Sequence, residues 1–301
     1  MKKIGIIGFG SIGQRHYNNI RALYPKFQVN ILTKRSDIKP DENTAIFASE
    51  KKFFAQTNDI FFITNETNKH AQTIAKCLLQ NPVGVFVEKP ISHNLTGIDK
   101  IARMTAKQKT VFFVGYCMQF YPPFVKLKQS LKQIGKPLFI RASVGQDLRT
   151  WRARDYRENY SYDSSRGGGV VLDLIHEINY PAWLLGQKIL FKTGIVRKLK
   201  AFKIESENIS ESLFQSEKGV IISIHQDYLR NPGRRYCEIV GTKGTLVWDS
   251  LGAPKPSKDM HQEELKFFIK KVKKQNGYTN ITEAVSDLRN TLALKKTYAK
   301  N

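Results

Sequence analysis

The chain has few cysteines and no long apolar run. Its 301 residues include three cysteines, Cys77, Cys117 and Cys237, which are far apart and form no Cys-x-x-Cys pair. Because an odd number of dispersed cysteines does not suit a disulfide framework, we expect a reduced, cytoplasmic protein. No apolar run approaches the ~20 residues that a membrane-spanning helix requires, so we do not expect an integral membrane protein.

Acidic residues are scarce beside basic ones. The chain has 26 Asp and Glu residues against 49 Lys and Arg residues, a formal net charge of +23 at pH 7. Such a balance raises nucleic acid as a partner, since bound cations release counterions from phosphates. Here the lysines are spread along every segment, and no recognition motif is present. We therefore expect a solvated surface that attracts an anionic cofactor, and no nucleic-acid or membrane partner.

The first part of the chain, residues 1–121, predicts an α/β domain. Short apolar runs alternate there with segments of helical period, which is typical of a doubly wound parallel sheet of the Rossmann type. The amino terminus looks like the start of a signal peptide, but a glycine turn interrupts it and no cleavage site follows, so we expect a first strand instead. The predicted strands are Lys3–Ile7, Gln28–Thr33, Ala45–Ala48, Asp59–Thr64, Gly84–Val87 and Thr110–Gly115.

Residues 122–301 predict an α+β domain for substrate binding and oligomerisation. Strand-like runs follow one another through short polar turns, which favours an open, mostly antiparallel sheet. A helix is predicted over Val171–Leu185, and two helices close the chain. The predicted strands are Leu138–Val144, Ile189–Leu199, Ile209–Ser216, Gly219–Asp227, Arg235–Val240 and Thr245–Trp248.

The most informative motif is Gly-Phe-Gly-Ser-Ile-Gly, between the first apolar run and a helical segment. A dinucleotide site needs a tight turn, a bare backbone beside the pyrophosphate and a close strand-to-helix contact, and Gly8, Gly10 and Gly13 supply these. A helix that begins near Ser11 and Ile12 directs its free N–H groups toward the phosphates. The alternative is a glycine-rich turn that only connects strand to helix.

Cofactor choice depends on the end of the second predicted strand. An acidic side chain there would bind the ribose 2′-hydroxyl of NAD, but the sequence is Thr33-Lys34-Arg35-Ser36, with no carboxylate before Asp37. Two cations flanked by hydroxyls would neutralise a 2′-phosphate, which favours NADP over NAD. The alternative is that these are ordinary loop cations and that Asp37 faces the ribose.

A lysine ends the fifth predicted strand. In Glu88-Lys89-Pro90, the proline stops strand pairing and holds the residue before it extended. A lysine at the carboxyl end of a parallel strand lies in the crevice where ligands bind in such sheets, so Lys89 is a candidate catalytic residue. A solvated lysine at a strand end is the alternative.

A helix after a glycine triplet (residues 167–169) carries further candidate groups. Asp173, His176 and Tyr180 lie at positions i, i+3 and i+7 of the predicted helix and so share one face. A carboxylate and an imidazole in this apolar stretch are costly to bury without a partner or a function. The alternative is a core histidine paired with Asp173.

Five arginines are interleaved with aromatic residues between Arg149 and Arg166. Aromatic faces stack on sugar rings, and arginine forks bind carboxylates or phosphates bidentately, so the segment favours an anionic or nucleotide-linked sugar as substrate. The alternative is an exposed loop whose aromatic residues anchor it to the sheet. The candidate substrate-binding residues here are Trp151, Arg152, Tyr156, Arg157 and Tyr160.

Together these motifs resemble the glucose-fructose oxidoreductase/inositol dehydrogenase family, Gfo/Idh/MocA, over nearly the whole chain. The resemblance implies that Lys89, Asp173 and His176 line the nicotinamide site and that the open sheet face forms a homodimer or homotetramer. It also implies that the last helix, about residues 280–299, returns to the first domain. The resemblance also implies that Asn65, His70, Glu88 and Tyr116 are site residues. The motifs that carry it are the glycine turn, Thr64–His70, Glu88–Pro90, Gly115-Tyr116, Gly167–Asn179 and Glu238–Gly244.

The chain departs from the family pattern at two positions. Asp173 and His176 are three residues apart, where the family usually has four, and Gln119 stands where an arginine usually precedes the phenylalanine. The first departure concerns the substrate contact of Asp173, and the second concerns a contact to substrate or cofactor.

The residue types predict hydride transfer between a nicotinamide cofactor and a carbinol or carbonyl carbon of a sugar or sugar derivative. His176 is suited to take the hydroxyl proton, and Lys89 to stabilise the negative charge on the same oxygen. Asp173 would orient the imidazole or a substrate hydroxyl. The alternative function is a catalytically silent NAD(P)-binding sensor of the same fold.

Overall fold

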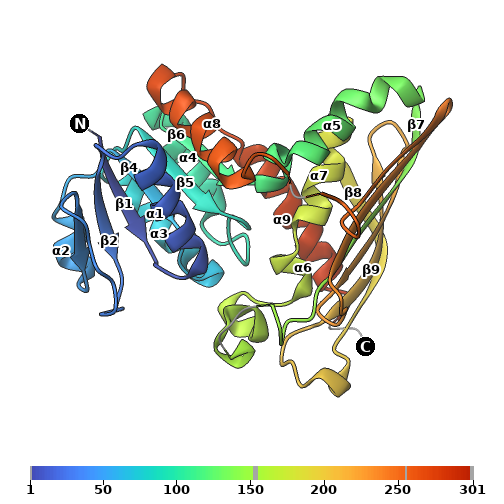
Figure 1. The fold of residues 1–301 in the computed structure, drawn as a ribbon, viewed down its shortest axis with the longest axis horizontal. Helices are drawn as coiled ribbons and strands as arrows, with labels where there is room; N and C mark the ends of the chain where they lie inside the picture. Colours follow the sequence, from blue (N-terminus) through green and yellow to red (C-terminus); the bar gives the residue numbers. More distant parts are fainter. Residues whose placement is uncertain (1, 152–154, 255, 299–301) are drawn as a thin grey trace. The chain divides into compact units, whose positions relative to one another are not determined.

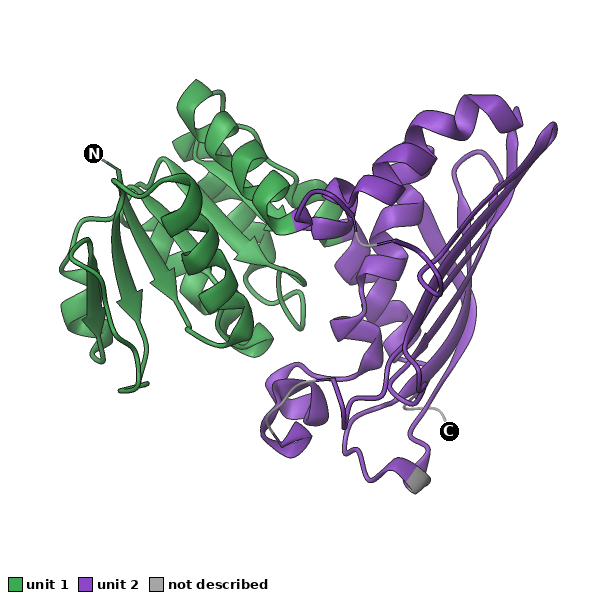
Figure 2. Ribbon diagram, in the orientation of Figure 1, with its two compact units in different colours: residues 1–115, 261–285 green, residues 116–260, 286–301 purple. Residues whose placement is uncertain are grey.

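The computed structural model describes residues 2–151, 155–254 and 256–298, and the chain divides into two units (Figure 2). Unit 1 comprises residues 1–115 and 261–285, and unit 2 comprises residues 116–260 and 286–301. The sequence placed a single boundary after residue 121. The division differs because the last strand of unit 1 ends at Gly115 and because the segment 261–285 packs on the sheet of unit 1.

Unit 1 is built around a six-stranded sheet (Figure 1). Its order is β3-β2-β1-β4-β5-β6, and every neighbouring pair is parallel. This is a doubly wound sheet, as predicted, and its order reverses between β1 and β4, where such sheets bind ligands at the carboxyl ends of the strands. The strands are β1 (Lys3–Ile7), β2 (Gln28–Leu32), β3 (Thr44–Phe47), β4 (Ile60–Ile63), β5 (Gly84–Glu88) and β6 (Val111–Gly115).

Helices cover both faces of this sheet. His16 of α1 and Phe268 of α8 both pack on Phe62 and Phe86, so α1 and α8 share one face. The helices α3 and α4 pack together on the other face (Figure 1). The helical segments of this unit are α1 (Ser11–Leu23), α2 (Glu50–Phe54), η1 (Thr67–Lys69), α3 (His70–Leu78), α4 (Ile98–Gln108) and α8 (Met260–Lys274).

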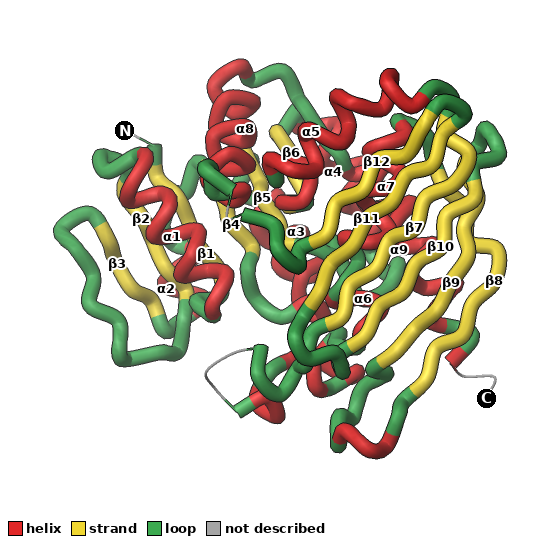
Figure 3. Tube along the Cα trace, turned by 45° about the vertical axis from the view of Figure 1, so that its right-hand side comes forward, coloured by secondary structure: helices red, strands yellow, loops and turns green. Residues whose placement is uncertain are grey.

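Unit 2 contains a second six-stranded sheet, in the order β12-β11-β7-β10-β9-β8 (Figure 3). The pair β7–β10 is parallel, and the other neighbouring pairs are antiparallel. The prediction of a mostly antiparallel sheet is therefore confirmed. The strands are β7 (Pro137–Gly145), β8 (Ile189–Arg197), β9 (Ile209–Ser216), β10 (Ile221–Asp227), β11 (Arg234–Gly241) and β12 (Gly244–Asp249).

The helices of unit 2 gather on one face of its sheet (Figures 1 and 3). The other face, which we call the outer face, exposes aliphatic side chains. Within the described part of the chain, no helix is both long enough and apolar enough to cross a membrane. The helical segments are η2 (Cys117–Phe120), α5 (Pro122–Ser130), η3 (Leu131–Ile134), η4 (Tyr156–Glu158), η5 (Tyr160–Tyr162), η6 (Ser164–Arg166), α6 (Val170–Asp173), α7 (His176–Leu185), η7 (Lys200–Phe202) and α9 (Ile281–Lys295), of which residues 281–285 belong to unit 1. The aliphatic residues of the outer face, which are 43–57% exposed, are Leu190, Ile195, Leu213, Ile221 and Val247.

The single helix predicted over residues 171–185 is interrupted. Its first part, α6, ends at Asp173, Leu174 leaves the helical conformation (φ −94°, ψ 31°), and α7 begins at His176. The Leu174 carbonyl accepts hydrogen bonds from the Glu177 backbone N–H at 3.2 Å and from the Gln226 side chain of β10 at 2.7 Å. Asp173 and His176 therefore do not lie on one continuous helical stripe, and the prediction of a shared face is wrong.

Candidate active site

The glycine turn after β1 leaves room for a ligand at one point and none at the others. Gly8 has φ +92°, and a Cβ there would lie 2.6 Å from the Asn65 backbone nitrogen. A Cβ on Gly13 would collide with the Gly8 carbonyl, whereas one on Gly10 would meet nothing within 4 Å. The turn is thus closed against its own sheet and bare at Gly10, which fits the close approach of a pyrophosphate.

The helix that follows this turn presents its amino terminus to the same point. Helix α1 begins at Ser11, and its N-cap residue, Gly10, provides no side-chain hydrogen bond to the first turn. The first turn also contains no acidic residue. Its N–H groups and the positive end of the helix dipole are therefore suited to an anion. Ser11 and Ile12, both predicted to bind cofactor, lie in this turn.

The segment after β2 holds Arg35 in a fixed position beside the glycine turn. Its guanidinium donates hydrogen bonds to the Asp37 carboxylate at 2.8 and 2.5 Å and to the Phe9 carbonyl at 3.2 Å. The Arg35 backbone N–H donates to Thr33 Oγ1 at 3.2 Å. Asp37 is thus engaged by Arg35, and the neighbouring Lys34 is exposed. The cationic character predicted for this segment lies near the glycine turn.

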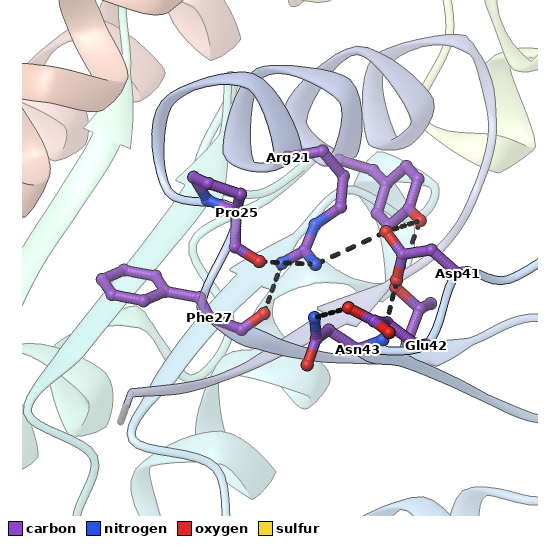
Figure 4. Close-up of polar contacts among 8 residues, drawn as sticks. Arg21, Pro25, Phe27, Asp41, Glu42 and Asn43 are labelled. Atoms are coloured by element: carbon purple, nitrogen blue, oxygen red, sulfur yellow. Dashed lines mark hydrogen bonds and ion pairs between the residues drawn. The ribbon is translucent and has the colours of Figure 1, made fainter.

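A polar network anchors the far end of the same segment to α1 (Figure 4). Arg21 donates to the Pro25 and Phe27 carbonyls and, at 3.5 Å, to Asp41. Asp41 also accepts a hydrogen bond from Thr44 Oγ1 at 2.7 Å. That hydrogen bond, together with the Arg21 charge, holds the pKa of Asp41 below its usual range. The segment between β2 and β3 is thereby fixed at both ends.

His70 is a buried link between two loops. Its Nδ1 lies 2.8 Å from the Pro90 carbonyl oxygen, and its Nε2 lies 3.0 Å from the Asn65 carbonyl oxygen. Burial lowers the pKa of the imidazole, while the two carbonyls raise it, and the net pKa lies below the usual value. Both polar atoms of the ring are used within unit 1. His70 therefore ties the turn after β4 to the loop that carries Lys89.

Glu88 and Lys89 lie at the carboxyl end of β5. The Glu88 carboxylate is 2.7 Å from His16 Nε2 of α1. Burial raises the pKa of Glu88, but the hydrogen bond and the charges of His16, His261 and Lys89 lower it further, and the net pKa lies below the usual value. Lys89 follows at the edge of the sheet where the glycine turn also lies, and it is partly exposed.

In unit 2, His176 lies beside the residues that follow β6. It is buried at the start of α7, with Nε2 at 3.6 Å from the Cys117 sulfur. The Tyr116 ring is 6.2 Å away, in an edge-on orientation. An imidazole held at the first turn of a helix, beside an aromatic ring, has the restricted orientation that a general base needs.

Asp173 is a buried hydrogen-bond acceptor. It accepts hydrogen bonds from the hydroxyls of Tyr160 (2.6 Å), Ser161 (2.7 Å) and Tyr228 (3.0 Å). Burial and the nearby Asp173 charge raise the pKa of Tyr228 well above its usual value, so this hydroxyl stays a donor. Tyr160, predicted to bind substrate, is thus bonded to Asp173.

An ion pair and a chain of side-chain hydrogen bonds lie around α7, and neither was predicted from the sequence. Arg235 donates to Glu177 at 2.6 Å, and its NH1 lies 3.4 Å from the Met118 sulfur. Gln119 donates to Asn179 Oδ1 at 3.0 Å, and Asn179 donates to Asp287 at 2.7 Å. Gln119, which replaces the usual family arginine, is therefore part of a network inside unit 2.

The basic aromatic segment packs largely on unit 2 itself. Trp151 and Tyr156 are partly buried against a core cluster that includes Tyr228. Arg157 is held by Asp155 in a bidentate pair, with hydrogen bonds of 2.6–3.0 Å. These contacts favour the anchoring alternative for these residues. The predicted substrate residue Arg152 lies outside the described residues.

Comparisons with known proteins agree with both units. Residues 2–116 match a family model described as "Oxidoreductase family, NAD-binding Rossmann fold", and residues 124–247 match one described as "GFO/IDH/MocA C-terminal domain". The chain belongs to the Gfo/Idh/MocA family of oxidoreductases. The resemblance stated from the motifs is confirmed, and so is the prediction of an enzyme with an NAD-binding Rossmann domain.

Several relatives of this Gfo/Idh/MocA chain are named inositol dehydrogenases. The chain is 26% identical to myo-inositol 2-dehydrogenase of Thermotoga maritima, over 90% of this chain and 88% of the relative. A crystal structure of myo-inositol 2-dehydrogenase from Lactobacillus plantarum has a TM-score of 0.85 at 16% identity, covering 99% of this chain and 97% of that one. A crystal structure of scyllo-inositol dehydrogenase from Lactobacillus casei, with bound NAD(H) and scyllo-inositol, has a TM-score of 0.81 at 21% identity. The match covers 100% of this chain and 98% of that one. These structures show a shared fold.

The residues of the Gfo/Idh/MocA chain fit a nicotinamide dinucleotide at the glycine turn, because Gly10 is bare and the first turn of α1 has no side-chain cap. Among residues 2–151, 155–254 and 256–298, no group of three or more His, Cys, Asp or Glu side chains is placed to hold a metal ion. The partners His16 and Arg235 were missed because their contacts join residues far apart in the chain. A histidine on the inward face of α1 was the one available signal for His16.

Proposed function

We propose that the chain is a cytoplasmic NAD(P)-dependent dehydrogenase that oxidises a carbinol of a polyol or sugar, with an inositol as the first candidate. The observation that carries the proposal is the position of Lys89, at the same edge of the sheet as the glycine turn. The relatives named inositol 2-dehydrogenase support the substrate class. The three cysteines, which are buried and free of disulfides, support a reducing compartment.

Three side chains have separate roles in the proposed reaction. His176 accepts the proton of the substrate hydroxyl as general base. Lys89 donates a hydrogen bond to the same oxygen and stabilises its negative charge. Asp173, fixed by its three hydroxyl donors, orients His176 or a second substrate hydroxyl. When bound, the nicotinamide cofactor supplies the hydride acceptor. In the reverse direction His176 or Lys89 returns the proton.

A neutral polyol suits the site better than the anionic or nucleotide-linked sugar that the arginine-rich segment first favoured. Arg149 and Arg157 each pair bidentately with the aspartate two residues earlier, at 2.7–3.2 Å and 2.6–3.0 Å. Each of these guanidiniums thus already has a carboxylate that neutralises its charge. We therefore propose a substrate recognised through its hydroxyl groups.

We further propose that NADP is preferred over NAD. The pairing of Asp37 with Arg35 weakens the alternative in which Asp37 faces the ribose. Arg35 is also held at the Phe9 carbonyl, next to the glycine turn, where a 2′-phosphate would exchange with Asp37 for its guanidinium. Lys34 adds a second cation there.

The test is an oxidation assay with myo-inositol, scyllo-inositol and a panel of neutral sugars, each with NADP⁺ and NAD⁺. We expect turnover on at least one polyol, with a higher kcat/KM for NADP⁺. Binding of both cofactors without turnover on any of these substrates would contradict the proposal and favour the silent sensor. Turnover with the same kcat/KM for both cofactors would remove the NADP preference alone.

Arg35→Asp sharpens the cofactor arm of this assay. A hydrogen bond to a charged group contributes about 1.5–3 kcal/mol, so the affinity for NADPH should fall by roughly 10- to 100-fold while that for NADH changes little. Fluorescence titration measures both. The matched control is Arg103→Asp, which makes the same charge change at an exposed position of α4.

We also propose that the chain forms a homodimer or homotetramer through the outer face of unit 2. Exposed aliphatic side chains from four of its strands lie on this face, and such patches mark contact surfaces between proteins. Light scattering should report a dimer or tetramer for the native chain and a smaller species for Leu213→Lys. A monomeric native chain at micromolar concentration would contradict this part.

A further inference from the structure

Four titratable side chains meet inside unit 1, between α1, α8 and the end of β5. His16 is fully buried, and its ring lies 6.1 Å from that of His261. His261 Nδ1 is 3.8 Å from the Glu264 carboxylate, and His16 Nε2 is 2.7 Å from Glu88. We call these residues the α1–α8 cluster. The chemistry proposed above uses none of them.

Glu264 is the unusual member of this cluster. It is 1% exposed, and neither of its carboxyl oxygens has a hydrogen-bond partner among the described residues. Aromatic rings pack beside the cluster, since Phe268 of the same helix packs on Phe62 and Phe86. A buried carboxylate without hydrogen bonds is very costly, so the neutral acid is the form that this site accepts. Burial, and the nearby Glu88 charge, raise the pKa of Glu264 well above its usual value.

Glu88 is held in the opposite state. His16 hydrogen-bonds its carboxylate, which favours the charged form. The contacts in the cluster thus favour the charged form of Glu88 and the neutral form of Glu264. Pairs of carboxyl groups whose surroundings move their pKa values in opposite directions are a recurrent feature of functional sites. If Glu264 were also charged, the two carboxylates would repel each other in an apolar interior.

The cluster adjoins the strand end that presents Lys89. Glu88 pairs in register with Gly115 of β6, and a Cβ on Gly115 would lie 3.5 Å from the Glu264 carboxyl oxygen. On the other side of Lys89, the Pro90 carbonyl is held by His70. The backbone of Lys89 thus lies between two buried anchors.

We propose that Glu264 is a positioning residue for Lys89: its neutral form leaves the Glu88–His16 pair in place, and its ionised form displaces Glu88 and with it the lysine. This inference rests on the proposed function, which gives Lys89 its catalytic role. The groups that act on Glu264 are Glu88 from β5, His16 from α1 and His261 from α8 itself. The residues that β4 and β6 contribute beside them, Phe62, Phe113 and Gly115, carry no charge.

The proposal makes a prediction about stability that needs no substrate. The pKa of Glu264 is higher in the folded chain than in the unfolded one. Its contribution to the free energy of unfolding is therefore complete below the ordinary pKa near 4.5 and is lost as pH rises through the pKa of the folded chain. Glu264→Gln keeps the shape and stays neutral. We expect this variant to melt at the same temperature as the native chain at about pH 5 and at a higher temperature at about pH 8.

The activity arm uses the same variant. Glu264→Gln should keep kcat and KM within about twofold at neutral pH, and the alkaline fall of kcat should move to higher pH. Glu263→Gln, whose partner is the exposed Lys266, is the matched control on α8 and should change nothing. Loss of folding or of kcat in Glu264→Gln would show that a charged carboxylate is required and overturn the proposal. Identical pH profiles and melting curves for native and variant chains would overturn it too.

Lys89→Met separates this inference from the proposed function. If Lys89→Met keeps full kcat, the catalytic role of the lysine is wrong, whatever result Glu264→Gln gives. If Lys89→Met loses kcat while Glu264→Gln leaves both pH profiles unchanged, the proposed function stands and the positioning role fails.

Discussion

Replacing His176 by asparagine is expected to lower kcat for polyol oxidation by roughly 10²- to 10⁴-fold, the usual contribution of a positioned general base. Asparagine is similar in size and forms hydrogen bonds, but it cannot accept the hydroxyl proton. The loss should appear in kcat rather than in cofactor affinity, because the proposed role of His176 is proton transfer from the substrate hydroxyl. Steady-state kinetics and NADPH titration measure the two quantities.

Chemical rescue separates a lost base from a disturbed fold. Added imidazole should restore part of the kcat of His176→Asn, since the shorter side chain leaves unfilled space beside Cys117 and Tyr116. A kcat equal to that of the native chain would contradict the general-base role. A fall in melting temperature with no rescue would instead assign His176 to the structure of unit 2.

Replacing Glu177 by alanine is expected to lower the free energy of unfolding of unit 2 by about 3–5 kcal/mol, the cost of leaving a buried partner unpaired. Glu177 is 0% exposed, and its partner Arg235 is 23% exposed. Burial lowers the pKa of Arg235, but Glu177 raises it further, and the net pKa lies above the usual value. An arginine keeps its proton throughout the ordinary pH range, so the guanidinium stays charged when the carboxylate is removed.

Urea unfolding followed by tryptophan fluorescence measures this loss, because Trp151, Trp183 and Trp248 all lie in unit 2. The matched control is Glu205→Ala, which breaks the ion pair between Glu205 and Lys198. Because the Glu205 side chain is 61% exposed, this variant should lower the free energy of unfolding by no more than about 1 kcal/mol. The double variant Glu177→Leu with Arg235→Met should recover much of the stability. A loss in Glu177→Ala no larger than in the control would contradict the prediction.

Strand positions and fold class could be predicted because each rests on local patterning. The apolar runs of both sheets lie within a few residues of the observed strands, as for β1 and β9, whose bounds agree with the prediction. The Gly8–Gly13 turn was identifiable because the glycines that it requires recur at a fixed spacing in its own sequence. The break at Leu174 was not, since it depends on Gln226, which is distant in the chain.

The candidate site was predictable in part. Lys89 could be placed from the strand that precedes it, but the side chains around it could not. His16 and His70 reach the loop of Lys89 through contacts spanning 72 and 20 residues. The aromatic residues Trp151 and Tyr156 were ambiguous for a different reason, since stacking on a sugar and packing on a sheet require the same apolar ring.

The central claim is that Lys89 and His176 act on one substrate oxygen. A crystal structure of the chain with NADPH and scyllo-inositol bound tests it most directly. We expect one inositol hydroxyl within about 3.2 Å of both Lys89 Nζ and an imidazole nitrogen of His176. A bound inositol whose hydroxyls contact neither group, or contact each through separate carbons, would contradict it.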